Sequence, residues 1–237
     1  MLQLFSAHTS RVQVMFNGYT PDTRRINFIE QISGHVDSYA KVPHEPPLHL
    51  VQRSNGSYQA AQQCKQWITE AQKFGNHQQG NVGNGERRLG TRNVDIWSYE
   101  SESLLKTVKT MIWDFQEKSN WNMRLVDIEV PQFCVYYGTK NSHYTWHKDS
   151  RNFLHPQLGE RKISLSMLLN DSSEFKGGEL DILTGMSEAG KPLVSTANLK
   201  DPGDVVFFRS DQYHRVRPVT QGTRAVMVVW CWGTGNF

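Results

Sequence analysis

The feature that most constrains the fold of this 237-residue chain is a series of short extended segments in its second half. From about Val126 onward, β-branched and aromatic residues concentrate in segments separated by turn signals such as Asp201-Pro202-Gly203-Asp204. Most connections are too short to hold a crossover helix, so we expect antiparallel pairing. The pattern predicts an α+β protein built on a double-stranded β-helix, or jelly roll. The predicted strands lie within residues 126–138, 161–170, 178–183, 204–210 and 223–233.

Two amphipathic stripes in the first half predict helices that pack on one outer face of this roll. Apolar residues recur at three- and four-residue steps from Ala60 to Phe74 and from Leu104 to Phe115, and Ser101 or Ser103 is available as an N-cap. We expect residues 1–58 to be an N-terminal extension, with a short helix near 26–32, and residues 59–237 to form the main domain.

Residues 75–93, between the two predicted helices, contain many glycines and amides. Few apolar groups are available there to offset the entropy of ordering, so the stretch predicts a mobile loop. Such a loop serves either as a lid beside a site or as a plain surface insertion.

Composition excludes several classes of protein. Lys and Arg total 26 against 23 Asp and Glu, a net charge of +3, without the basic stripe that a nucleic acid would require. The longest apolar run, residues 225–232, falls far short of the roughly 20 residues that span a bilayer. The N-terminus does not have the pattern of a signal peptide, and three scattered cysteines do not make a disulfide framework. We expect a soluble, cytoplasmic protein with neither a nucleic-acid nor a membrane partner.

The candidate metal ligands are His147, Asp149 and His214. His147 and Asp149 are two residues apart, so on a strand their side chains leave the same face and can meet one ion. Alone, this pair is a weak signal that a surface pair would explain equally well, and His214 alone would be a hydrogen-bonded core histidine. Together, two imidazoles and one carboxylate match the facial triad that holds Fe(II) and leaves adjacent positions open.

Arg224 stands at the start of the last predicted strand, followed by a run of alanine and valines. A buried guanidinium without an anionic partner is costly, so we expect either a structural ion pair or a bound carboxylate beside it. An oxygenase that uses a 2-oxo acid needs a planar fork of this kind for the far carboxylate of its co-substrate.

With these residues in place, the sequence resembles the Fe(II)- and 2-oxoglutarate-dependent dioxygenases, most closely the prolyl hydroxylases of the oxygen-sensing branch and their microbial relatives. The resemblance covers roughly residues 92–232 and makes residues 59–237 the dioxygenase domain. It implies His147, Asp149 and His214 as iron ligands, and Arg224 as the partner of the C5 carboxylate of 2-oxoglutarate. The cofactors implied are Fe(II), 2-oxoglutarate, O2 and ascorbate.

The resemblance also implies roles for residues outside the triad. Tyr137 matches a tyrosine of the co-substrate pocket. Leu168 departs from the pattern, because the oxygen-sensing enzymes place a co-substrate-binding tyrosine there; Tyr137, Ser164 or Ser166 must then supply part of that anchoring. The substrate-side residues implied are Tyr144, Arg161 and Trp230.

The resemblance implies hydroxylation of proline in a protein or peptide. The fold does not fix the substrate, so hydroxylation of another residue or of a small molecule is the alternative within the class. A jelly-roll module that binds a ligand without turnover is a second alternative, and a zinc hydrolase with the same ligands is a third, although it gives Arg224 no anionic partner. We further hypothesise that Arg87, Arg88 and Arg92 meet acidic groups flanking the target residue.

Overall fold

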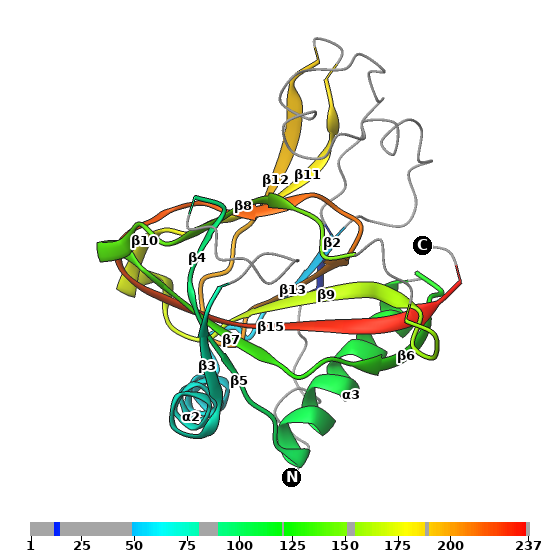
Figure 1. Ribbon diagram of the computed structural model, residues 1–237, viewed down its shortest axis with the longest axis horizontal. Coiled ribbons are helices and arrows are strands. Elements are labelled where there is room, and N and C mark those ends of the chain that lie inside the picture. Colours follow the sequence, from blue (N-terminus) through cyan, green and yellow to red (C-terminus); the bar gives the residue numbers. More distant parts are fainter. Residues whose placement is uncertain are drawn as a thin grey trace.

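The computed structural model describes residues 12–14, 49–80, 90–119, 121–150, 155–187 and 190–235. Two sheets face each other, and two helices lie beneath the larger one (Figure 1). All strand pairs in the described ranges are antiparallel, which confirms the predicted jelly-roll core. The short helix predicted at 26–32 lies outside the described residues.

The larger sheet has the strand order β1-β2-β13-β9-β15-β7-β5-β3, and β6 and β10 also pair with β15. The smaller sheet has the order β12-β11-β14-β8-β4. The elements of the larger sheet are β1 (Val12–Val14), β2 (His49–Gln52), β3 (Asn76–Gln79), β5 (Asp95–Ser98), β6 (Arg124–Ile128), β7 (Gln132–Tyr137), β9 (Glu160–Leu168), β10 (Phe175–Gly177), β13 (Val205–Arg209) and β15 (Val219–Thr234). Those of the smaller sheet are β4 (Arg92–Asn93), β8 (His143–His147), β11 (Leu180–Met186), β12 (Pro192–Ala197) and β14 (His214–Val216). The described residues also form two short 3-10 turns, η2 (Gly138–Lys140) and η3 (Ser172–Glu174).

The larger sheet is buried on both faces, and strand alternation divides its side chains between two cores. On β13, Phe207 belongs to the cluster that faces the helices, whereas Phe208 belongs to the cluster between the sheets. On β7, Val135 faces the helices and Tyr136 faces the smaller sheet. The sequence therefore reads as near-continuous apolar runs, because both faces of these strands need apolar residues.

The helices form where the apolar stripes predict them, as α2 (Tyr58–Phe74) and α3 (Glu102–Ser119). The hydroxyl of Ser57 caps α2 by accepting from the Ala60 amide, and that of Ser101 accepts from the Leu104 amide at the start of α3. The buried faces of both helices belong to one cluster with the larger sheet; the ring of Phe115 stacks on that of Phe207 with centroids 4.2 Å apart.

Part of the predicted mobile loop is regular structure, which corrects that expectation. β3 pairs with β5 and β4 pairs with β8, so backbone hydrogen bonds order both ends of the stretch without apolar side chains. Residues 81–89, with Arg87 and Arg88, lie outside the described residues.

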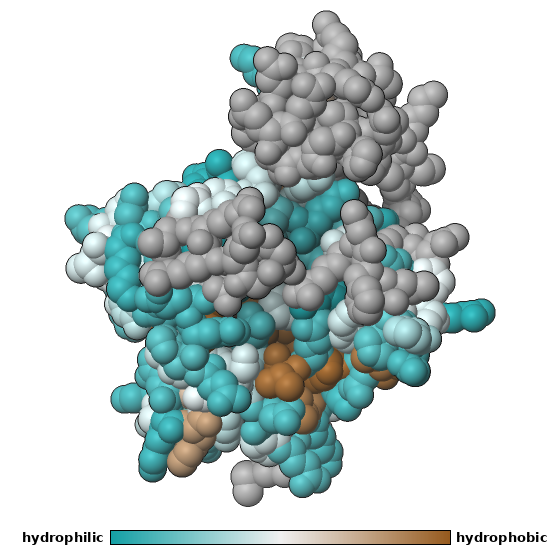
Figure 2. Space-filling model, viewed as in Figure 1, coloured by the Kyte–Doolittle hydropathy of each residue, from teal (hydrophilic) through white to brown (hydrophobic). Residues whose placement is uncertain are grey.

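The three cysteines are buried and free. Within the described ranges, neither helix has the length and apolar character needed to cross a bilayer. The face seen in Figure 2 is mostly hydrophilic; its most hydrophobic residues gather in a small area beside α3, and a second, paler area lies over α2.

Asp204 fastens the turn before β13 to the end of β2. Its fully buried carboxylate accepts hydrogen bonds from the backbone amides of Ser54, Lys200 and Asp201, and it pairs with Arg53 at 2.7 Å. Burial by itself raises the pKa of Asp204, but these hydrogen bonds lower it more, so the pKa lies below its usual range.

We expect Asp204→Asn to lower the free energy of unfolding by about 2 kcal/mol at pH 7, because the amide nitrogen would meet N–H donors. An aspartate whose pKa is lower in the folded than in the unfolded protein stabilises the fold above its unfolded pKa of about 4. That stabilisation is lost as the pH falls toward the folded pKa. The deficit should therefore shrink in acid. Urea unfolding from pH 7 to pH 3 tests this, with Asp201→Asn as the neighbouring control; a deficit that does not change with pH would contradict it.

Candidate metal centre

The three candidate ligands meet on the inner side of the smaller sheet. β14 pairs with β8 so that His214 stands opposite His147 in the register. Asp149 follows β8 directly, and its backbone amide donates to the Ser210 carbonyl at 3.0 Å. Antiparallel pairing thus places two imidazoles side by side although they are 67 positions apart in the sequence.

The ligand atoms form one compact cluster, all lying within 4.8 Å of one another. The Nε2 atom of His214 is 3.4 Å from one oxygen of Asp149, and the Nε2 atom of His147 is 3.6 Å from the other. His214 and Asp149 are only 5% and 6% exposed. Among the described residues this is the group of His, Cys, Asp and Glu with the geometry to hold a metal ion.

Neighbouring groups fix the orientation of each ligand. The Nδ1 atoms of His147 and His214 lie 2.8 and 3.0 Å from the backbone carbonyls of Thr145 and Gln212. A carbonyl only accepts, so each Nδ1 carries the proton and each Nε2 keeps a lone pair for a metal. The Ser164 hydroxyl donates to Asp149 at 2.7 Å.

The electrostatics suit a cation. Burial, and after it the neighbouring His214, lower the pKa of His147 to about 3, so this imidazole is neutral at pH 7. Burial alone would raise the pKa of Asp149, but His214 and His147 outweigh it and hold that pKa at about 2. A neutral imidazole and an ionised carboxylate are the forms that bind a divalent metal.

A cavity of about 40 Å³ adjoins the cluster, and Arg224 lines it. Arg224 lies within β15 and not at its start; it is 3% exposed, and its Nη1 atom has no hydrogen-bond partner among the described residues. Burial lowers the pKa of Arg224, and Tyr136, Cys134 and Glu179 oppose the shift only in part. A buried guanidinium nitrogen left unpaired fits an anionic ligand, such as the carboxylate of a 2-oxo acid.

Tyr136 lines this cavity, and Tyr137 does not. Neighbouring side chains of a strand point to opposite faces, and Tyr137 packs instead against the helix-side core, with Lys140 over its ring. The guanidinium carbon of Arg224 lies 5.6 Å from the ring centre of Tyr136. Ser166 lines the cavity, whereas Ser164 holds Asp149.

The predicted substrate-side residues lie around the cluster in different ways. Tyr144 stacks on His147 with ring centroids 3.5 Å apart, and Trp230 also lines the cavity. Arg161 is buried; its guanidinium covers the Trp230 ring at 3.9 Å and pairs with Glu129. The Arg161 guanidinium also donates to the backbone carbonyl of Asp149 at 3.4 Å. With these contacts, Arg161 positions Trp230 and the backbone of Asp149.

Arg92, which lies within the stretch predicted as a mobile loop, lines the cavity in the structure. Strand β4 places it opposite Tyr144, and its guanidinium carbon lies 4.6 Å from the centre of that ring. It lines the cavity, and its predicted contact with acidic groups flanking the target residue stays a prediction. No local pattern marks it, because β4 contains only two residues between glycine-rich and polar stretches.

Ser164→Ala tests the support of Asp149. Removing a hydrogen bond to a ligating carboxylate typically costs about 10–100-fold in metal affinity, and we expect a loss in that range. Calorimetric titration with Mn(II) measures the metal affinity. Ser166→Ala, two residues along the same strand face, is the matched control, and equal affinities in the two variants would contradict the assigned role.

Residues 131–232 match the family model described as the 2OG-Fe(II) oxygenase superfamily. A PKHD-type hydroxylase from Psychrobacter sp. is 36% identical over 103 residues, which are 42% of this chain and 36% of the relative. The chain thus aligns with little more than a third of that relative's length.

Solved structures share the fold. A prolyl hydroxylase from Trichoplax adhaerens, in complex with a hypoxia inducible factor peptide fragment, superposes with a TM-score of 0.61 at 14% identity, over 78% of this chain and 84% of the other. A viral collagen prolyl hydroxylase from Paramecium Bursaria Chlorella virus-1, in its 2OG complex, gives 0.51 at 16% identity, over 73% and 91%.

The family model covers the segment that contains the metal cluster and Arg224, and the fold agrees with it. Residues 131–232 of this chain are therefore similar to the 2OG-Fe(II) oxygenase superfamily in sequence, and the structure has a fold of the same kind.

Proposed function

We propose that this protein is an Fe(II)- and 2-oxoglutarate-dependent dioxygenase that hydroxylates proline in a protein or peptide. The observation that carries the proposal is one site lined by two imidazoles, a carboxylate and the Arg224 guanidinium, whose Nη1 atom has no hydrogen-bond partner in the described part of the chain. The match of residues 131–232 to the family model and the similarity to PKHD-type and prolyl hydroxylases support it.

The donor set fits a ferrous ion, with His147, Asp149 and His214 as the protein ligands and positions left for a chelating co-substrate. Once bound, ferrous iron, 2-oxoglutarate and O2 supply the oxidative chemistry, and ascorbate keeps the metal reduced. A zinc hydrolase would leave the Nη1 atom of Arg224 without an anionic partner, so we rank it below the oxygenase.

The protein's own side chains bind the co-substrate, orient the target bond and exclude water from the site. Arg224 holds the far carboxylate of the co-substrate, and Tyr136 takes the co-substrate-side position predicted for Tyr137. The rings of Tyr144, Phe208 and Trp230 line the cavity, which limits water near the reacting atoms and fixes the target C–H bond. Arg161 acts as a positioning residue through Trp230.

For the substrate, we propose a proline-containing protein or peptide in the cytoplasm. The Trichoplax prolyl hydroxylase was solved with a peptide fragment, which supports a polypeptide substrate here. Hydroxylation of a small anionic molecule is the second candidate, and Arg92 favours it, because a second guanidinium lines the same cavity as Arg224. An acidic substrate would find a counter-charge there.

Mass spectrometry of candidate substrates tests the assignment. The protein is incubated with Fe(II), ascorbate and 2-oxoglutarate together with a proteome digest, and, in a parallel reaction, with free amino acids and organic acids. We expect succinate release and addition of one oxygen to proline in peptides. Oxygen added only to lysine, asparagine or a small acid would contradict the prolyl assignment, and no succinate in any reaction would contradict the enzyme class.

A further inference from the structure

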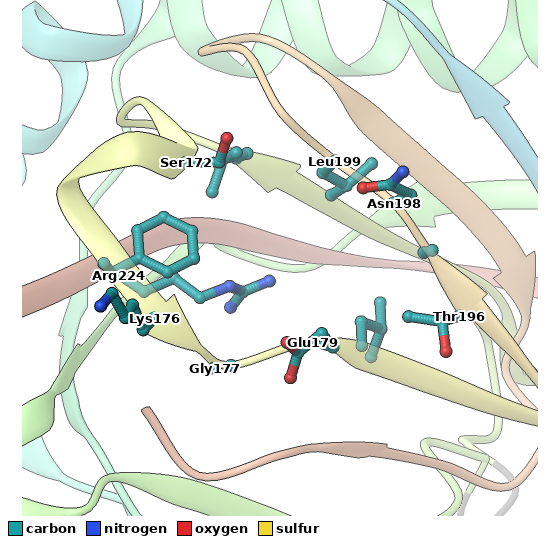
Figure 3. A pocket seen from close by; sticks show the side chains of 13 residues that line it. Ser172, Lys176, Gly177, Glu179, Thr196, Asn198, Leu199 and Arg224 are labelled. Atoms are coloured by element: carbon teal, nitrogen blue, oxygen red, sulfur yellow. The ribbon is translucent and has the colours of Figure 1, made fainter. Parts of the chain in front are cut away.

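A second and larger cavity lies next to the metal site. It has a volume of about 390 Å³ and shares Leu180 and Arg224 with the 40 Å³ cavity beside the metal cluster. Figure 3 shows the guanidinium of Arg224 extending into the space between Ser172, Glu179 and Leu199. Arg224 thus stands where the two cavities adjoin.

The volumes of the two cavities limit where a 2-oxo diacid can bind. A water molecule needs about 10–15 Å³ of such volume, so the cavity beside the metal cluster has room for about three waters. A 2-oxo diacid of the length of 2-oxoglutarate or longer is several times larger than a water molecule and exceeds that space. A diacid that chelates a metal at His147, Asp149 and His214 must therefore extend past Leu180 toward Arg224 and the larger cavity.

We propose that the larger cavity is the distal part of the co-substrate chamber, and that this chain accepts 2-oxo diacids longer than 2-oxoglutarate. The inference rests on the proposed function. A closed pocket discriminates against one extra methylene by about 10–200-fold, because the longer chain has no space. Here the anchoring guanidinium faces open volume, and Leu168, a short apolar side chain, lines that volume.

The charges around the larger cavity determine where the distal carboxylate of the diacid lies. Arg224 is buried and its Nη1 atom has no hydrogen-bond partner from the residues that the structure describes, so it attracts the distal carboxylate. Glu179 is exposed at the rim and opposes an anion that reaches outward. Replacing Glu179 by glutamine should therefore tighten the binding of the longer diacid more than that of the shorter one.

Calorimetry on the Mn(II)-loaded protein measures affinity without turnover. We expect the dissociation constants of 2-oxoadipate and 2-oxoglutarate to agree within about threefold. A closed pocket would instead weaken the binding of the longer acid by about 10-fold or more, because it has no space for the extra methylene. If 2-oxoglutarate binds and 2-oxoadipate binds more than about tenfold more weakly, this inference is wrong and the proposed function stands. If neither acid binds, the proposed function itself fails.

Filling the cavity gives a second test. Ser172→Phe places a ring at the cavity wall, and it should weaken 2-oxoadipate about tenfold while leaving 2-oxoglutarate within about twofold. Ser173→Phe is the matched control, because Ser173 is the exposed neighbour on the same short turn and does not line the cavity. Unchanged affinities in a folded Ser172→Phe protein would overturn the inference. Should the Ser172→Phe variant not fold, Glu179→Gln replaces it as the test. An unchanged ratio of the affinities for 2-oxoadipate and 2-oxoglutarate in Glu179→Gln would also overturn the inference.

Discussion

Asp149→Ala is expected to abolish both ferrous binding and succinate release. Asp149 supplies the one carboxylate of the cluster, and it lies within 3.6 Å of both imidazole Nε2 atoms. Without it, a dication would sit in a buried site with no anionic ligand from the triad, which is heavily disfavoured. Anaerobic calorimetry with Fe(II) and a succinate assay measure the two losses.

The control for this variant is Asp127→Ala, because Asp127 is a surface carboxylate paired with Lys109. It should bind iron like the parent protein. We expect His147→Ala to behave like Asp149→Ala, since the two side chains share the ion. Iron binding by the Asp149→Ala protein with the parent affinity would contradict the ligand assignment.

Arg224→Ala should chiefly raise the requirement for 2-oxoglutarate. Hydrogen bonds from a guanidinium to a carboxylate contribute about 2 kcal/mol or more, so the KM for 2-oxoglutarate should rise about 30-fold or more. The turnover rate at saturating 2-oxoglutarate should change much less, because the metal ligands remain in place. Steady-state kinetics over a wide range of 2-oxoglutarate concentration separates the two parameters.

Arg224→Lys should restore part of the affinity, because lysine keeps the charge but loses the planar fork. Arg217→Ala is the matched control: Arg217 is a half-buried arginine just before β15 that pairs with Asp181. An Arg224→Ala protein that is folded and has an unchanged KM would remove Arg224 from the co-substrate site.

The metal cluster could be predicted from the sequence because it depends on local rules. The two-residue spacing of His147 and Asp149 fixes a shared side at the end of a strand, and His214 follows an apolar strand that had to pair within the roll. Their roles as ligands remain predictions, but the structure brings all three together as the spacing requires.

The lining of the cavity could not be predicted in the same way. β7 is buried on both faces, so hydrophobicity does not tell which of Tyr136 and Tyr137 faces the smaller sheet. Arg92 reaches the cavity through β4, a two-residue strand whose order comes from its pairing with β8. Such placements depend on contacts between distant segments, which periodicity does not encode.

The edge strands were also missed by the sequence patterns. β3 is a run of four polar residues, Asn76–Gln79, and β12 starts at a proline, so neither has the apolar alternation of an internal strand. Both lie at the ends of their sheets, where one side of the backbone has no strand partner. Strands of this kind are ordered by their neighbours more than by their own composition.

The central claim is that His147, Asp149 and His214 hold one ferrous ion, and anomalous scattering tests it most directly. A crystal grown anaerobically with Fe(II) and 2-oxoglutarate should give a single strong peak at the iron absorption edge, within bonding distance of both Nε2 atoms and one carboxylate oxygen. The chelated co-substrate should extend from that peak toward Arg224. An iron peak elsewhere, or His214 turned away from the ion, would contradict the account.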